Sequence, residues 1–183
     1  MNIKKVVIIV LLIIGMISIL YYLNKQQQEE YFSPIPIERD INFVINETEM
    51  TFLDTIAYTG MVKLGLEDNL IKFVVLSDKT KEEFRKQTDS DLKAHIIYQD
   101  GVSYVFIDKM TRDEAILVMS HEFQHIQQYD SKRLKLIGPG KVVWLGDTID
   151  VLTLDYNDRP WEKEAFNNER NFKEDLLKLL YVK

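Results

Sequence analysis

Two histidines with a glutamate between them are the residues of this chain whose types and spacing are best suited to chemistry. His121 and His125 are four residues apart, and Glu122 follows the first of them. Residues four apart lie one above the other on a helix face, so both imidazoles can point at one ion. Glu122 lies one step round the helix, where it can reach a water on that ion without binding the ion itself. H-E-x-x-H on a helix is the sequence form of a zinc site of this kind.

The chemistry expected of this motif needs a zinc ion with an open position. A catalytic zinc binds three protein ligands and keeps a fourth position for water. Zinc lowers the pKa of that water, and a glutamate can accept its proton as the water attacks a carbonyl. The flanking Ser120, Phe123 and Ile126 are small or apolar and favour such a helix. The competing interpretation is an ordinary helix with a packed or exposed histidine pair, because short motifs also occur by chance.

The third ligand of such a site has to be a carboxylate. The chain has three histidines and none of them follows His125, while His95 lies upstream in a predicted hairpin. A third histidine in the pattern H-E-x-x-H-x-x-G-x-x-H is therefore excluded. The chain also has no cysteine, which excludes thiolate ligands and disulfide bonds. We interpret His95 as a packed or surface histidine.

The candidates for that carboxylate are Glu162 and Glu164, in the segment R-P-W-E-K-E-A at residues 159–165. Pro160 can occupy the first turn of a helix there. Glu162 shares a helix face with Ala165, whose small side chain would let this helix approach the H-E-x-x-H helix closely. Glu164 lies on the opposite side and is expected to be a solvated charge, so we prefer Glu162. The alternative interpretation is an ordinary acidic first turn, which the helix dipole favours.

Two further residues could stabilise the negative charge that develops on an attacked carbonyl oxygen. Tyr156 lies six residues before Glu162 and is the first candidate, and Arg159 is the second. Each of them could instead be structural, because side chains such as tyrosine also have an apolar face to bury. Gln128 follows His125 by three residues, lies on the histidine face of the helix, and could support the metal ligands without binding the metal.

The elements that must position these residues alternate between helices and strands in an α+β pattern. Thr111 to Glu114 (T-R-D-E) match a capping box and predict the start of the H-E-x-x-H helix. Asp100 and Gly101 lie between β-rich flanks and predict a two-residue turn. In chain order we expect a helix at 48–64, a strand at 70–76, a short helix at 79–87, a hairpin at 94–108, a helix from 111 to about 132, a second hairpin at 137–154 and a helix from 161 to about 181.

The N-terminal segment is typical of a membrane anchor. Val6–Leu23 comprises 18 residues without a charge. As a helix rising about 1.5 Å per residue it would span about 27 Å, close to the hydrocarbon thickness of a bilayer. Tyr21 and Tyr22 lie at its far end, where aromatic rings favour the interface. A cleavable signal peptide is the rival interpretation, but no small-x-small cleavage site follows. Lys4 and Lys5 predict a cytoplasmic N-terminus and an extracytoplasmic remainder.

At these motifs the sequence resembles zincin metallopeptidases of the gluzincin kind, which combine H-E-x-x-H with a glutamate on a later helix. The closer likeness is to small bacterial and phage peptidases in which an H-E-F-Q-H helix and a short β excursion precede Y-x-x-R-P-W-E-x-E-A, here Tyr156–Ala165. The resemblance covers roughly residues 94–170. It implies that the two histidines of the motif and Glu162 bind one Zn²⁺ per chain, and that Glu122 is the general base.

Two more expectations follow from this resemblance. In such folds a strand before the active helix often holds the substrate as an added strand, which here implies peptide pairing at the edge of Ser103–Ile107. The ligand helix of the family often carries Asp or Asn four residues after the glutamate. This chain departs from that pattern, because Phe166 occupies the position.

We therefore expect a transmembrane anchor at 1–24, a proline-broken linker at 25–40, and a small zincin-like α+β domain at 41–183 whose active-site helix packs on a small β-sheet. The expected function is a membrane-anchored zinc metallopeptidase. It would hydrolyse a peptide or protein substrate through Glu122-assisted attack of a zinc-bound water, with Tyr156 as a second catalytic residue. The alternatives are a zinc-dependent amidase acting on a non-protein substrate such as cell wall, and a catalytically silent zincin-fold binding module. Because the net charge is −6 and no basic stripe is present, nucleic acid is not an expected partner.

Overall fold

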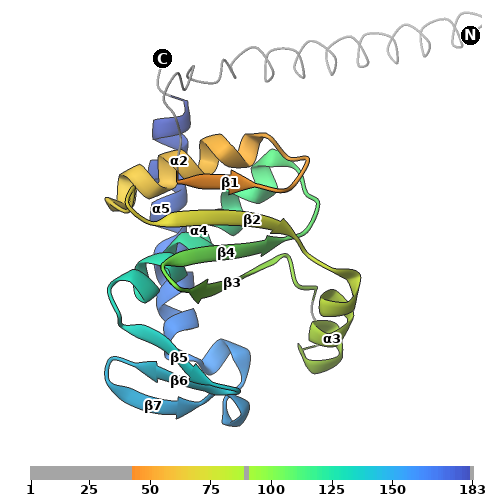
Figure 1. Cartoon of the computed structure of the whole chain (residues 1–183), viewed down its shortest axis with the longest axis vertical. Coiled ribbons are helices and arrows are strands. Elements are labelled where there is room, and N and C mark those ends of the chain that lie inside the picture. The colour runs from red at the N-terminus through yellow and green to blue at the C-terminus, as the bar shows by residue number, and fades with distance from the viewer. Residues whose placement is uncertain (1–42, 89–90, 182–183) are drawn as a thin grey trace, which may run out of the picture. The chain divides into compact units, whose positions relative to one another are not determined.

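The computed structural model describes residues 43–88 and 91–181, which form a mixed α+β domain with two sheets and, within those ranges, four α-helices (Figure 1). The α+β class expected from the sequence is confirmed. The expected anchor at 1–24 and the expected linker at 25–40 lie outside the described residues. Among the helices of the described ranges, none is both long enough and apolar enough to cross a bilayer.

The larger sheet consists of β1 (Val44–Asn46), β2 (Leu70–Val75), β3 (Ala94–Gln99) and β4 (Val102–Ile107), in the order β1-β2-β4-β3. β1 and β4 are each parallel to β2, whereas β3 and β4 form the predicted antiparallel hairpin. Asp100 and Gly101 close that hairpin with positive φ angles of 52° and 80°, as a type I′ turn requires. The strand β1 was not predicted, because three residues are too few to show an alternation.

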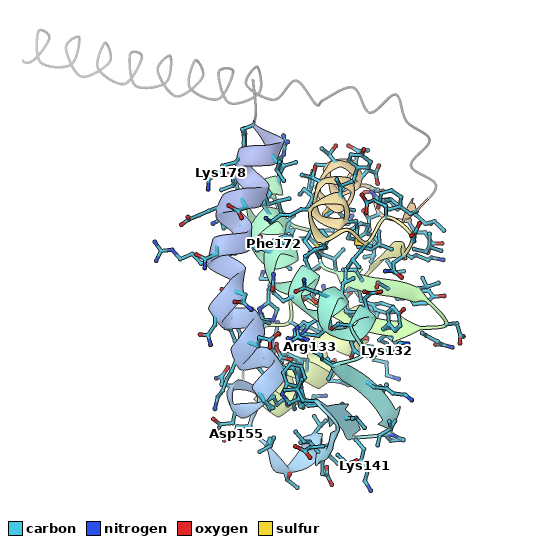
Figure 2. All side chains as sticks on the ribbon, turned by 90° about the vertical axis from the view of Figure 1, so that its left-hand side faces the viewer. Lys132, Arg133, Lys141, Asp155, Phe172 and Lys178 are labelled. Carbon is cyan, nitrogen blue, oxygen red and sulfur yellow. The ribbon has the colours of Figure 1, made fainter. Side chains whose placement is uncertain are left out.

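Four helices accompany the sheet: α2 (Phe52–Leu64), α3 (Asp78–Thr88), α4 (Arg112–Asp130) and α5 (Pro160–Leu180). α2 and α4 cover one face of the larger sheet, and α5 packs against both of these helices (Figure 1). Alternation along β2 places Ile71 and Phe73 in the main core, together with apolar residues of the three helices. Phe172 projects from α5 (Figure 2). Its ring packs on that of Phe123 of α4, with 5.5 Å between the ring centroids.

The helix α2 has a defined start, a defined end and a close contact with α4 at its middle. It begins at Phe52 rather than at 48, because the Thr48 amide donates to Asn46 Oδ1 at 2.9 Å and forms a turn. It ends at Gly65 as predicted, with a left-handed φ of 68°. A Cβ at Gly60 would overlap an aromatic ring of α4, so glycine allows the two helices to approach.

The smaller sheet is an antiparallel meander of β5 (Leu134–Gly138), β6 (Lys141–Trp144) and β7 (Asp147–Asp150), in that order. The expected hairpin at 137–154 is wrong in its extent, because a third strand precedes it and two short 3-10 helices follow β7. Leu134 pairs with Trp144 across the sheet. Both are buried with Val142 and Trp161 in a second, smaller core, which attaches this sheet to the start of α5.

The two helices that carry the candidate site begin where the sequence predicts. The Thr111 amide donates to Glu114 Oε2 at 2.8 Å, and the Glu114 amide donates to Thr111 Oγ1 at 3.4 Å. This is the predicted capping box at the start of α4. Pro160 is the first residue of α5, where its missing amide hydrogen costs no helical hydrogen bond.

Candidate metal centre

The central turns of α4 are buried on all sides. Every residue from Met119 to Ile126 is buried, because the larger sheet lies against one side of α4 and α5 lies against another. His121, Glu122 and His125 are accordingly only 9%, 5% and 8% exposed. Buried polar and charged groups need hydrogen-bond, ionic or metal partners. The groups that surround these three side chains therefore define the site.

The first turn of α5 brings Glu162 against the two histidines. Its Oε2 lies 3.3 Å from His121 Nε2 and 3.3 Å from His125 Nε2, and the two Nε2 atoms are 3.1 Å apart. The three atoms form a nearly equilateral triangle. In tetrahedral geometry, bonds of about 2.0–2.2 Å to zinc separate neighbouring ligand atoms by about 3.3–3.6 Å. His121, His125 and Glu162 therefore fit the ligand set of one zinc ion.

The outer nitrogen of each imidazole is also held. His121 Nδ1 lies 3.0 Å from Glu169 Oε2, and His125 Nδ1 lies 2.9 Å from Gln128 Oε1. Both partners are acceptors, so each Nδ1 donates a hydrogen, and whenever the imidazole is neutral its Nε2 carries none. Each Nε2 then directs its lone pair toward the centre of the triangle, which is the tautomer that a metal needs.

Gln128 links the His125 side of the triangle to Glu164. The Gln128 side chain is fully buried, and its Nε2 donates to the Trp161 carbonyl oxygen at 3.0 Å and to Glu164 Oε1 at 3.2 Å. These two bonds fix the orientation of the amide, with Oε1 toward His125. Glu164 faces away from the triangle, as expected. It is not simply solvated, however, because Arg133 Nη1 lies 2.7 Å from its Oε2.

Without a metal, both histidines of the triangle can instead hold a proton and form ion pairs with the buried Glu162 carboxylate. Burial lowers the pKa of His125, but its hydrogen bond to Glu162 and the nearby carboxylates outweigh this effect and raise that pKa to about 9. The pKa of His121 is raised by the same balance of causes. Burial raises the pKa of Glu162, yet hydrogen bonds from both histidines hold it well below its usual range. A metal and protons therefore compete for the same three ligand atoms.

Glu122 lies beside the triangle and is not part of it. Its Oε2 is buried and has no hydrogen-bond partner among the described residues. Burial raises the pKa of Glu122, although the two histidines oppose that shift. A carboxylate with an unused oxygen and a raised pKa is suited to accept a proton from a water at the centre.

Both candidates for oxyanion stabilisation lie next to this centre. Tyr156 belongs to a short 3-10 helix, Tyr156–Asp158, that precedes α5. Burial raises the pKa of Tyr156, and the charge of Glu162 and a hydrogen bond with it add to the shift. The hydroxyl therefore stays protonated and can act as a donor. The Arg159 guanidinium carbon lies 5.3 Å from the centroid of the Tyr156 ring.

Two cavities meet at the candidate centre. The first has a volume of about 360 Å³, and His125 is among its lining residues. The second has a volume of about 450 Å³, and His121 and Glu169 are among its lining residues. Glu122 and Tyr156 line both cavities. An extended molecule that occupies both cavities would therefore pass the candidate base and the candidate oxyanion stabiliser.

The strand expected to hold a substrate is not at an edge of the sheet. Ser103–Ile107 lies in β4, which pairs with β2 on one side and with β3 on the other. Both edges of β4 are occupied, so the expectation of peptide pairing along this segment is wrong. The edge strand next to β4 is β3, and β1 forms the opposite edge. Ala94, His95 and Ile96 of β3 line the first cavity.

His95 lies near the centre without joining it. Its ring stacks on Phe106, with centroids 4.8 Å apart and an angle of 8° between the planes. Burial lowers the pKa of His95, which favours the neutral imidazole. The interpretation of His95 as a packed histidine agrees with these contacts.

Two residues of α5 contact His121 and were not predicted to do so. Glu169 follows Glu162 by seven residues, which is close to two helical turns. The sequence therefore shows that the two share a helix face, but not that Glu169 meets His121. Phe166 occupies the position where the family pattern has Asp or Asn, and its ring centroid lies 4.6 Å from that of His121. Phe166 thus packs against the His121 imidazole, and the carboxylate beside His121 Nδ1 comes from Glu169.

Comparison of the chain with protein-family models, with curated proteins and with solved structures finds no match. The site is characterised by its own geometry. Two imidazole nitrogens and one carboxylate oxygen surround one point. Beside them lies a buried carboxylate oxygen of Glu122 that has no hydrogen-bond partner within residues 43–88 and 91–181.

Proposed function

We propose that the protein is a zinc-dependent metallopeptidase with a zincin-like fold, in which His121, His125 and Glu162 hold the metal. The observation that supports this most strongly is the triangle of ligand atoms with edges of 3.1–3.3 Å. Three protein ligands of this composition leave a fourth position open, which is typical of catalytic rather than structural sites. When bound there, zinc would supply a water of lowered pKa and would polarise the substrate carbonyl.

Glu122 carries the proton transfers in this proposal. Its unpartnered Oε2 accepts a proton from the water as the water oxygen attacks the carbonyl carbon of the peptide bond. The same carboxyl group then donates this proton to the departing amine nitrogen as the C–N bond breaks. The raised pKa of Glu122 suits it to the second transfer, in which it acts as an acid.

Tyr156 and β3 would act on the substrate directly. The protonated hydroxyl of Tyr156 donates a hydrogen bond to the carbonyl oxygen as negative charge develops there. The free edge of β3 presents backbone groups that an extended peptide can pair with. Because β3 residues line the first cavity, a peptide added to β3 would lie close to Glu122.

We further propose that residues 1–24 anchor the protein and that the domain is extracytoplasmic. The charge-free segment Val6–Leu23, with Lys4 and Lys5 before it, supports this orientation. In sealed vesicles with a known orientation, an added protease is expected to digest the domain only from the extracytoplasmic side. Digestion only from the cytoplasmic side would contradict the proposed topology.

The proposed activity is tested with the zinc-loaded full chain and with Glu122→Gln. Mass spectrometry of a peptide library is expected to show cleavage by the wild type. Glu122→Gln is expected to bind zinc equally well and to cleave about 10²- to 10⁴-fold more slowly, because its amide cannot accept the proton. Full activity of Glu122→Gln would contradict the mechanism. Cleavage of cell-wall fragments but of no peptide would replace the peptidase by an amidase.

A further inference from the structure

Arg159 is a cationic residue in the wall of the first cavity whose charge has no acidic partner among the described residues. It lines this cavity together with Glu122 and Glu162. Its Nε is buried and has no hydrogen-bond partner within the part of the chain that the structure describes. Two other arginines of the domain are paired with acidic residues: Arg133 lies 2.7 Å from Glu164, and Arg85 lies 2.6 Å from Asp91.

An unpaired guanidinium in such a position needs an explanation. Removing a charge from water is unfavourable unless a partner compensates for it, so partly buried arginines are normally paired. Half-buried Arg159 instead faces a cavity. Charged groups left unpaired in a cleft are characteristic of binding sites, because the ligand supplies the missing partner.

The backbone and Tyr156 place the Arg159 side chain in one position relative to the triangle. Arg159 is the N-cap of α5 in an extended conformation, and Pro160 after it disfavours the helical alternative. Glu162 follows three residues later on the same rigid helix. The guanidinium also lies over the Tyr156 ring, with its carbon 5.3 Å from the ring centroid. A guanidinium held in this way is preorganised for bidentate binding of a carboxylate.

The rest of the cavity wall makes the charge of Arg159 selective. Glu83, Glu122 and Glu162 also line the cavity, so elsewhere a carboxylate ligand would meet like charges. The neighbouring Trp161 and Tyr129 are largely apolar and reduce the water around a bound group. An ion pair with less water around it is stronger than one in bulk solvent. Among the described residues that line this cavity, Arg159 is the only lysine or arginine. Away from the proposed metal position, it is therefore the group that attracts an anion.

We propose that Arg159 binds a carboxylate of the substrate, so that the protein acts on peptides with a carboxylate close to the scissile bond. This inference rests on the proposed peptidase function and names its substrate class. The carboxylate could be a free C-terminus or the side chain of Asp or Glu, and both present the same two oxygens to the guanidinium. Arg159 is then a specificity residue and not the oxyanion stabiliser, a role that remains with Tyr156.

Four matched peptide hydroxamates test this inference by calorimetry on the zinc-loaded full chain. The hydroxamate is the zinc-binding group, and the peptides differ only in a free or amidated C-terminus and in Glu or Gln beside the hydroxamate. For one of these two features, the probes that carry the carboxylate are expected to bind about 10- to 100-fold more tightly than the probes that carry the amide. A difference between the free and the amidated C-terminus would identify a C-terminal carboxylate as the ligand of Arg159. A difference between Glu and Gln would identify a side-chain carboxylate.

Variants at Arg159 separate carboxylate binding from other roles. Arg159→Gln is expected to abolish the difference in affinity between carboxylate and amide probes, whereas Arg159→Lys is expected to keep part of that difference. Arg85→Gln makes the same charge change in an exposed ion pair and is the matched control. If Arg159→Gln does not fold, two other measurements provide the same test. Arg159→Lys should reduce the preference for the carboxylate probes, and high salt should weaken that preference in the wild type.

Three results would overturn the inference, and they are distinguishable. Equal binding of all four probes by the wild type would show that no carboxylate is recognised, while the proposed zinc site would stand. A uniform loss of affinity for all probes in Arg159→Gln would place Arg159 at the oxyanion and would also overturn the inference. Failure of all four probes to bind a protein that holds zinc would contradict the proposed function itself, and the inference with it.

Discussion

Glu162 and Glu164 are only two residues apart on α5, yet their surroundings differ. We call these surroundings the Glu162 region and the Glu164 region. Glu162 is 6% exposed and faces two imidazoles, with no lysine or arginine bonded to it among the described residues. The Glu164 side chain is 30% exposed and lies 2.7 Å from Arg133. The charge of Glu164 is therefore compensated by the protein itself. The negative charge of Glu162 is balanced by protons on the two histidines or by a metal. A bound metal should therefore stabilise the Glu162 region, whereas added salt should weaken the ion pair of Glu164.

The largest expected effect is on stability in the presence of zinc. At a free zinc concentration of about 1,000 times the Kd, binding should stabilise the folded protein by about 4 kcal/mol. His125→Asn removes one corner of the triangle and should abolish this gain. His95→Asn should retain it, because His95 lies outside the triangle. Thermal unfolding with zinc and with a chelator measures the effect, and an equal gain in both variants would remove the distinction between the histidines.

A smaller effect is expected when the group behind His121 is removed. Glu169 accepts the Nδ1 hydrogen of His121 at 3.0 Å and fixes the tautomer. Loss of such a partner usually lowers metal affinity about 10- to 100-fold. Glu169→Ala should show this loss in a zinc competition titration. Glu174→Ala is the control, because Glu174 is a half-exposed residue of the same helix that pairs with Arg170; a loss of equal size there would contradict the role of Glu169.

The pH dependence of the metal-free protein should also distinguish the two regions. The pKa of His125 is raised from 6.5 to about 9 in the folded state, so the folded state binds the proton more tightly than the unfolded state does. The stabilisation is fully present below pH 6.5 and is lost as the pH rises through about 9. Urea unfolding between pH 6 and 10 should show this decrease in the free energy of unfolding. The same decrease in His125→Asn would show that another group is responsible.

The smallest effect is expected in the Glu164 region. Arg133 and Glu164 are both about one-third exposed, at 32% and 30% for the side chains, and such pairs contribute about 0.2–1 kcal/mol. Arg133 also lies over the Trp144 ring, 5.6 Å from its centroid. Arg133→Gln should therefore lower the free energy of unfolding by about 1 kcal/mol and change zinc affinity less than Glu169→Ala does. A larger change in zinc affinity would mean that the two regions are coupled through Gln128.

Local chemistry made several elements of the fold predictable from the sequence. The capping box at Thr111 to Glu114, the turn at Asp100 and Gly101, and Pro160 each specify backbone geometry within a few residues. The choice of Glu162 over Glu164 as the residue facing the histidines rested on helix periodicity, and the structure places Glu162 against both imidazoles.

The rest depended on contacts between distant segments and could not be predicted in this way. The position of β4 between β2 and β3 follows from strand order, which no local pattern within Ser103–Ile107 reveals. The extent of the smaller sheet follows from the burial of Leu134 with Trp144 and Trp161. The contact between Glu169 and His121 requires the packing of α5 on α4 to be known, although the seven-residue spacing from Glu162 was visible.

The measurement that tests the central claim most directly is the zinc content of the purified full chain by elemental analysis, with Glu162→Gln and Glu164→Gln alongside. Our account predicts about one zinc per folded chain for the wild type and for Glu164→Gln, because both keep the three ligands. It predicts markedly less zinc for Glu162→Gln. A folded wild type that holds no zinc even after reconstitution, or equal zinc in both variants, would contradict the account.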